Sequence, residues 1–233
     1  MFTGYSDKVG DFFWELRFNN SREWFNPRKA EFDQLVMQPT KALANELYDW
    51  FQEQYPALGL NLHISRIYRD ARRLFGRGPL KDEIWFSFQN EIEHRDGAPN
   101  FWFEVGAEGY GLGFGYWMRA ADAARMRKFI DQDAKPMEKL ARQFARQDMF
   151  TLTGEEYAKP KGHADDLLGP WYNKRWIGFR CLRPYDDISA SRELLTFAED
   201  GFRFMIPYYQ YFDQISRMAD KKRAEPRLRP FSF

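Results

Sequence analysis

Two stretches in the middle of the chain decide the fold, Ile84-Trp-Phe-Ser-Phe-Gln89 and Phe101-Trp-Phe-Glu-Val105. In both, large apolar residues occupy every second position, which is the period of a strand with one buried face. A third alternating stretch runs from Tyr110 to Trp117, with glycines along one face. The turn residues Asp96-Gly97 and Glu108-Gly109 separate the three stretches at hairpin distances. The pattern predicts an antiparallel sheet.

Helical periodicity surrounds these strands on both sides. Ser6 can cap a first helix that Asn19-Asn20 ends, Ser21 can cap the next, and a longer helix follows Pro39. Helices are also predicted at 120–131, 137–147 and 191–218 (interrupted or kinked at Pro207), with a further strand at 175–182. We therefore expect an α+β fold, with a mostly antiparallel central sheet flanked by N-terminal and C-terminal helices.

The chain of 233 residues shows no internal repeat or linker before its last stretch. This predicts one α+β domain over residues 1–218. Residues 219–233 are basic and interrupted by prolines, which is typical of a flexible tail.

The composition suits a protein with a sizeable core, since 44% of the residues are hydrophobic and 18% are aromatic. A single cysteine excludes an internal disulfide and fits a reducing compartment. No signal segment opens the chain, and no apolar run approaches the ~20 residues that span a bilayer. We expect a cytoplasmic protein with no membrane association. The net charge of +1 makes a nucleic-acid partner less favoured.

The most unusual charge pattern lies between Arg66 and Lys81, where six cations accompany one acid, Asp70. Guanidinium groups match the oxygens of carboxylates and phosphates, so the segment predicts a site for a small anion. Its candidate residues are Arg66, Tyr68, Arg69, Asp70, Arg72 and Lys81. On a strand from Asn61 to Asp70, Arg69 would share a face with His63. The alternative is that the arginines form structural ion pairs with Asp82, Glu83 or Asp70.

Asn20 and Arg22 form a second candidate, because Ser21 would place them at the start of a helix, where an anion is favoured. The alternative is a capping turn anchored by Trp24 or Phe25. The glycines at 109, 111, 113 and 115 lack the spacing of a dinucleotide-binding loop. On a strand they would bare one face, for close packing or for a flat ligand.

Nucleophiles and metal ligands are scarce. Cys181 shares its predicted face with apolar residues and is expected to be a buried thiol. No zinc motif occurs, and the run from His163 to Asp166 is the one weak alternative for a metal. The sequence predicts no cofactor and no metal, and it assigns no catalytic residue.

Several motifs resemble one family. They are Asn19-Asn-Ser-Arg-Glu-Trp-Phe25, Arg66-x-Tyr-Arg-Asp-x-Arg72, Pro79-Leu-Lys81, Gly113-Phe-Gly-Tyr116 and Lys159-Pro-Lys-Gly162. In order and spacing they are similar to those of the uncharacterised DUF2461 proteins over about residues 2 to 185. The chain departs from that pattern at Arg73–Gly78 and at Leu80, where an acid and a tyrosine are usual. The resemblance implies a soluble single domain without an established activity, and it adds Lys161 to the candidate ligand-binding residues.

Two functions remain open. The first is a site for a small anionic ligand, with Tyr68 or Asp70 as the available proton carriers and aromatic side chains beside the cations. The alternative is a nucleic-acid or protein-binding module without catalysis. The sequence leaves undecided whether the protein is an enzyme and what its oligomeric state is.

Overall fold

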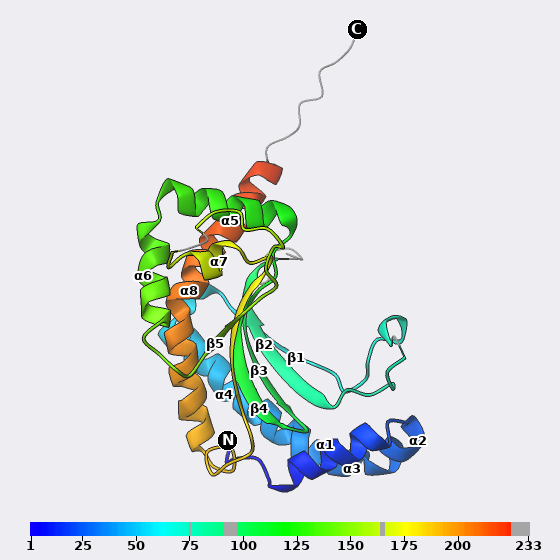
Figure 1. Cartoon of the computed structure of the whole chain (residues 1–233). Helices are drawn as coiled ribbons and strands as arrows, with labels where there is room; N and C mark the ends of the chain where they lie inside the picture. Colours follow the sequence, from blue (N-terminus) through cyan, green and yellow to red (C-terminus); the bar gives the residue numbers. More distant parts are fainter. Residues whose placement is uncertain (75, 91–96, 164–165, 225–233) are drawn as a thin grey trace.

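The computed structural model describes residues 1–74, 76–90, 97–163 and 166–224 (Figure 1). Its helices are α1 (Lys8–Phe18), α2 (Arg22–Phe25), α3 (Lys29–Phe32), α4 (Gln38–Gln54), α5 (Ala120–Gln132), α6 (Lys135–Phe144), α7 (Gly169–Tyr172) and α8 (Glu193–Ala224). Its strands are β1 (Asn61–Ile64), β2 (Glu83–Gln89), β3 (Pro99–Gly106), β4 (Gly109–Tyr116), β5 (Thr151–Thr153) and β6 (Ile177–Arg183). Short 3₁₀ or π turns occupy Asn26–Arg28, Asp33–Met37, Pro56–Leu58 and Ala71–Arg73.

The strands form one sheet in the order β1-β2-β3-β4-β6-β5, and each neighbouring pair is antiparallel. Helices precede and follow the main block of strands, so the predicted α+β class is confirmed. The turn predicted at Glu108-Gly109 joins β3 to β4, and Gly109 adopts a φ of 135° that a residue with a side chain rarely accepts. The turn predicted at Asp96-Gly97 lies partly outside the described residues.

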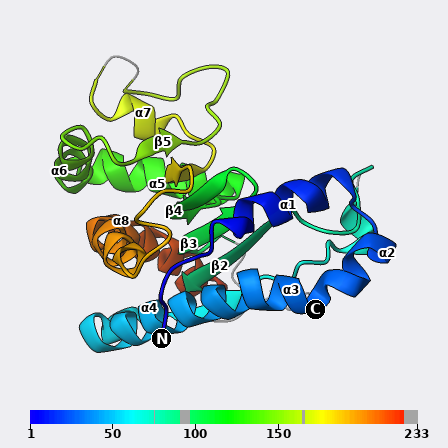
Figure 2. The ribbon, with the colours of Figure 1, turned by 90° about the horizontal axis from the view of Figure 1, so that it is seen from below.

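The alternating phenylalanines build the core on one face of the sheet, against α4 and α8 (Figures 1 and 2). Phe51 of α4 stacks on Phe101 of β3 at 5.2 Å between ring centroids, and Tyr209 of α8 stacks on the same ring at 4.8 Å. Phe86 and Phe103 face each other across β2 and β3 at 5.1 Å. The strong period-two signal therefore marks the face that the two long helices cover.

The helix boundaries follow the predicted signals closely. Ser21 caps α2, since its Oγ accepts a hydrogen bond from the backbone N–H of Trp24 at 3.2 Å. Asn19 ends α1, and Pro39 lies in the first turn of α4. Pro207 lies inside α8, which continues to Ala224, while residues 225–233 of the predicted tail lie outside the described part.

The strand predicted from Asn61 to Asp70 is shorter than expected, since β1 ends at Ile64. The described residues 65–74 and 76–82 then form a two-stranded extension, here called the projecting segment, which lies beside α1 and α2 (Figure 1). The backbone N–H of Ser65 donates to Trp85, whereas the backbone N–H of Lys81 donates to Ile67. These two pairs are two residues apart on one strand and four apart on the other, so the pairing is irregular here. The side chain of Arg69 is directed to Leu80 and Asp82.

No helix within the described ranges is both long and apolar enough to cross a lipid bilayer.

Candidate functional site

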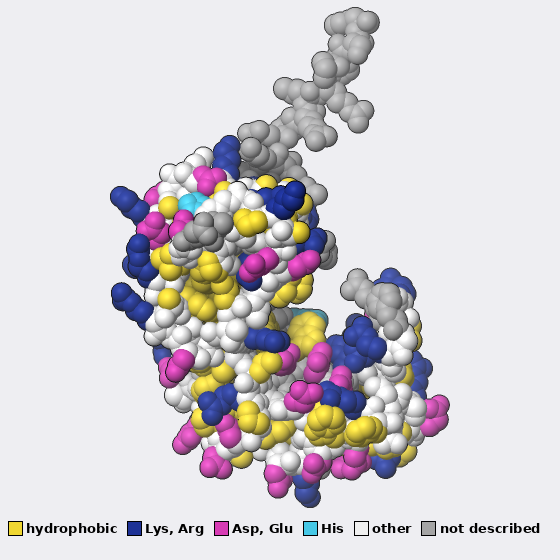
Figure 3. Space-filling model, in the orientation of Figure 1, with side chains coloured by type: hydrophobic (Ala, Val, Ile, Leu, Met, Phe, Trp, Pro, Cys, Tyr) yellow, Lys and Arg dark blue, Asp and Glu magenta, His cyan; other side chains and the backbone are white. Residues whose placement is uncertain are grey.

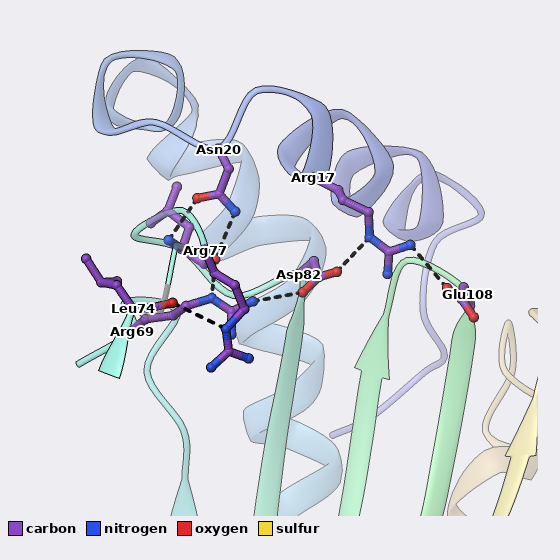
Figure 4. A network of polar contacts seen from close by, with 8 residues as sticks. Arg17, Asn20, Arg69, Leu74, Arg77, Asp82 and Glu108 are labelled. Atoms are coloured by element: carbon purple, nitrogen blue, oxygen red, sulfur yellow. Dashed lines mark hydrogen bonds and ion pairs between the residues drawn. The ribbon is translucent and has the colours of Figure 1, made fainter. Parts of the chain in front are cut away.

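Arg69, the central residue of the arginine-rich segment, is committed to structural contacts (Figure 4). Its Nε donates to the carbonyl of Leu80 at 2.9 Å, and its Nη2 donates to Asp82 Oδ1 at 3.1 Å. The side chain is 16% exposed, so little of the guanidinium faces solvent. Arg69 therefore joins the two strands of the projecting segment, the alternative that the sequence left open.

Asp82 is shared between two arginines from distant parts of the chain. Arg17 of α1 donates from Nε to Asp82 Oδ2 at 2.6 Å and from Nη1 to Glu108 at 3.1 Å (Figure 4). Burial opposes the charge on Asp82, but hydrogen bonds and charge from Arg17, together with Arg69, hold the pKa of that carboxyl below its ordinary value. The network fixes the base of the projecting segment to α1.

The side chain of Asn20 binds the backbone of the same segment. Its Nδ2 donates to Leu80 O and its Oδ1 accepts from Leu80 N, both at 2.9 Å. A cavity of about 370 Å³ lies beside this pair. Its lining includes Arg77 together with Arg17, Asn20, Arg69, Asp82 and Glu83. Two acids there offset two of the three positive charges, so the arginine cluster is largely neutralised.

The remaining motif residues of this region have local partners. Tyr68 lies edge-on to Phe25 at 5.9 Å between ring centroids, and the Arg22 guanidinium lies over the Tyr68 ring at 5.8 Å. Asp70 caps the turn at 71–73, and Arg72 binds it through Nη2 at 2.8 Å from a side chain that is 87% exposed. The geometry of α2, a single turn, favours the capping alternative for Asn20 and Arg22.

Lys81 differs from Arg69 and Arg72 because its ammonium has no ion-pair partner within the described residues. It lies over the Trp85 ring, 5.3 Å from the centroid. Burial lowers the pKa of Lys81, the charges of Arg69 and Arg66 lower it further, and Glu83 opposes them. Arg66 is exposed nearby and also lacks an ion-pair partner in the described part of the chain. These two cations are available to a ligand.

Lys161 does not join this group. Its backbone N–H donates to Asn173, and its ammonium lies over Tyr157 at 5.1 Å. That region adjoins α7, away from the projecting segment in both ribbon views (Figures 1 and 2). The structure thus brings together the central candidates and leaves Lys161 apart.

The sheet face opposite the core is left uncovered in its central part, and the surface is hollowed there, between the projecting segment and the body (Figure 3). We call this the open face. A cavity of about 450 Å³ lies on it. Its lining residues are His63, Trp85, Ser87, Gln89, Asn100, Trp102 and Glu104. The hollow thus combines two indoles with polar side chains, next to Lys81 on Trp85.

The strand register arranges the open face in rows across the sheet. One row contains only amides and small residues, namely Asn61, Gln89, Asn100, Gly115, Gly178 and Thr153. The next contains His63, Ser87, Trp102, Gly113, Arg180 and Thr151. A third contains Trp85, Glu104, Gly111 and Leu182. Side chains that are far apart in the sequence are therefore immediate neighbours on this face.

The glycines of β4 let neighbouring side chains lean across that strand. A Cβ on Gly113 would lie 2.5 Å from Trp102 Cζ2, and one on Gly111 would meet Leu182. The Trp102 indole therefore occupies the space that a side chain at Gly113 would take. Close packing, one of the two readings of the glycine strand, is what the structure contains.

Glu104 is the carboxylate that lines the cavity of the open face. Burial and the neighbouring charge of Glu83 raise its pKa to about 7, although Arg180 opposes the shift. Near neutral pH this group can therefore both hold and release a proton, as general acids and bases do. It also lines an adjacent cavity of about 360 Å³ that reaches Arg17 and Arg183.

The polar lining residues contrast with the arginine network in their hydrogen bonds. Within the described ranges, the side chains of Ser87, Gln89, Asn100 and Glu104 have no hydrogen-bond partner, whereas those of Arg69, Asn20 and Asp82 are hydrogen-bonded. Unpaired polar groups that face a cavity are free to bind a ligand. No group of His, Cys, Asp and Glu in the described residues suits a metal ion, and Asp165 of the weak metal candidate lies outside them.

The model of a protein family described as "Conserved hypothetical protein (DUF2461)" matches residues 8–211 of the chain. The chain belongs to the DUF2461 family. This confirms the resemblance noted in its motifs. No curated protein gives a significant match to it. Membership of DUF2461 does not assign an activity to the chain.

Sequence reasoning on this DUF2461 chain missed the open face as a site. Its signal was present, because Trp85, Ser87, Gln89, Trp102 and Glu104 alternate with the buried phenylalanines. That alternation indicates a second face but does not say whether a helix covers it. Cys181, by contrast, is buried as predicted, and burial raises the pKa of its thiol.

Proposed function

We propose that the open face binds a small organic molecule that carries a ring and an acidic group, a carboxylate or a phosphate. The single observation that carries this proposal is the lining of the 450 Å³ cavity, whose polar side chains, like the neighbouring Lys81, have no hydrogen-bond or ion-pair partner among the described residues. The ring would contact Trp85 and Trp102. The acidic group would contact Lys81, with Arg66 nearby.

In this proposal the anion binds to Lys81 and Arg66 of the arginine-rich segment rather than to Arg69 and Arg72. Arg69 serves the site by holding the projecting segment at the edge of the cavity, because its Nε and Nη2 groups bind Leu80 and Asp82. Arg72 is paired with Asp70 on an exposed surface. Within the segment, Lys81 and Arg66 are the candidates that have no ion-pair partner among the described residues.

A test is a titration of the purified protein with phenyl phosphate, benzoate, glucuronate and glucose 6-phosphate, followed by indole fluorescence and calorimetry. Phenol and glucose serve as the neutral counterparts. At least one acidic ring compound is expected to bind more tightly than its neutral counterpart. Trp102→Leu should abolish that binding, and Lys81→Met should weaken it about tenfold, as the loss of one charge-assisted hydrogen bond does.

The matched control is Trp14→Leu, which removes an indole of α1 that is 39% exposed and does not line the cavity. Its affinity should equal that of the wild type. Failure of every acidic compound to bind the wild type, or equal loss in Trp14→Leu and Trp102→Leu, would contradict the proposal. Binding of an oligonucleotide alone, with affinity that falls steeply with salt, would favour the nucleic-acid alternative.

A further inference from the structure

The polar groups of the open face outnumber its aromatic ones. Of the lining residues, His63, Ser87, Gln89, Asn100 and Glu104 carry hydrogen-bonding groups, and only Trp85 and Trp102 are apolar surfaces. A hydrocarbon or aryl ring seated there would remove water from these groups without replacing its hydrogen bonds. Each such loss costs about 1–3 kcal/mol, so the lining disfavours a plain hydrophobic ring.

The amide row has the chemistry of hydroxyl recognition. Asn61, Gln89 and Asn100 each present a carbonyl acceptor and an NH₂ donor, and a hydroxyl group both donates and accepts. The three residues lie on adjacent strands, so they are spaced by about 4.8 Å, which is comparable with the span of a six-membered sugar ring. A polyhydroxylated ring could therefore engage more than one of them at once.

Trp102 supplies the apolar counterpart. Its indole leans across β4 into the space over Gly113, one row away from Asn100 and Gln89. A sugar ring has a face of C–H groups and an edge of hydroxyls, so it can pack on an indole while its edge reaches polar side chains. On the open face the Trp102 indole and the amides of Asn100 and Gln89 are arranged so that one sugar ring can contact both.

We propose that the ligand of the open face is an acidic sugar, with its ring on Trp102, its hydroxyls on Gln89 and Asn100, and its carboxylate or phosphate toward Lys81. This inference rests on the proposed function and names the ligand class of the same site. Glu104, whose pKa lies at about 7, supports it, because a protonated carboxyl can donate to the ligand without repelling its acidic group.

The test compares two ligand classes on the same protein. Glucuronate and glucose 6-phosphate represent the acidic sugars, benzoate and phenyl phosphate represent acidic aryl rings, and adenosine monophosphate adds a base. Dissociation constants come from calorimetry, and saturation-transfer NMR identifies which ligand protons lie against the protein. An acidic sugar should bind most tightly, with saturation strongest on its ring C–H protons.

Asn100→Leu and Gln89→Leu keep the size of the side chain and remove its hydrogen bonds. Each should raise the dissociation constant for the acidic sugar about tenfold and leave that for phenyl phosphate within a factor of two. Gln54→Leu, at an exposed position at the end of α4, should change neither. Circular dichroism and melting curves establish that each variant is folded.

The outcomes separate this inference from the proposed function. If benzoate and phenyl phosphate bind more tightly than the sugars, the ligand is not a sugar, while the proposed function stands. The same holds if both amide variants weaken aryl and sugar ligands equally, or if only adenosine monophosphate binds. If no acidic ring compound binds, both the inference and the proposed function are wrong.

Discussion

Asn20 and Leu80 exchange two hydrogen bonds of 2.9 Å across 60 positions of the sequence, the side-chain amide of one pairing with the backbone of the other. The pair is partly buried, and Gly78 beside it leaves room for the amide, since a Cβ there would clash with Asn20. This contact, together with the network at Asp82, holds the projecting segment against the α1–α2 corner.

Replacement of Asn20 should therefore destabilise the protein. Asn20→Ala leaves the N–H and the carbonyl of Leu80 without partners, and the free energy of unfolding should fall by about 1–3 kcal/mol. Urea denaturation followed by fluorescence measures it. Asn19→Ala, which removes one exposed hydrogen bond to Glu15, is the matched control and should have a much smaller effect. Equal effects of the two variants would argue against the structural role of Asn20.

Arg69 and Arg72 should separate in the same assay. Arg69→Met removes the contacts to Leu80 and Asp82, and we expect a loss of about 1–3 kcal/mol in the free energy of unfolding. Arg72→Met removes only an exposed pair and should leave stability nearly unchanged. Under conditions where Arg69→Met is folded, its affinity for an acidic ring compound should exceed that of Lys81→Met. A lower affinity of Arg69→Met than of Lys81→Met would indicate that Arg69 binds the anion.

Gly113 and Gly115 offer a comparison within one strand. A Cβ at Gly113 would meet Trp102 and the carbonyl of Phe179, at 2.5 and 2.4 Å, whereas the nearest atom to a Cβ at Gly115 is the end of the Asn100 side chain, at 3.2 Å. Gly113→Ala should thus lower the melting temperature by several degrees more than Gly115→Ala, because overpacking costs about 1–3 kcal/mol. It should also shift the indole emission. Similar melting curves for the two variants would show that Trp102 does not depend on the bare strand.

Glu104 makes stability depend on pH in a defined direction. Its pKa rises from 4.5 to about 7 on folding, so between these values the folded state keeps a proton that the unfolded state has released. The contribution of this group to stability therefore falls as pH rises through that range, and levels off above about pH 7.

Glu104→Gln carries no such charge, so its stability relative to wild type should rise as pH increases from 4.5 to 7, by at most about 3 kcal/mol. Denaturation at several pH values measures the difference, and NMR titration of the Glu104 carboxyl checks the pKa directly. A stability difference that stays constant over this range would contradict the prediction.

Local patterns carried much of the fold. Phe86 and Phe103 predict their strands because a period of two residues is a property of the local chain. Ser21 and Pro39 predict helix starts because capping acts within one turn. Such signals need no knowledge of distant partners. They predicted the antiparallel sheet and its flanking helices.

The site depended on contacts that no local pattern contains. Arg69 and Lys81 both carry a positive charge and both lie in the projecting segment, yet only the tertiary structure pairs Arg69 with Asp82 and places Lys81 over Trp85. The irregular pairing that follows β1 places Arg69 against Leu80 and Asp82, a contact that strand alternation alone does not predict.

The sequence by itself determined that the central strands have two faces, one of phenylalanines and one of indoles and polar groups. Only the tertiary structure decided that α4 and α8 cover the first and that the centre of the second stays open. The physical reason is that alternation is encoded within a strand. Strand register and the docking of helices result from the packing of the whole core, and these bring Trp102, Asn100 and Gln89 together on one surface.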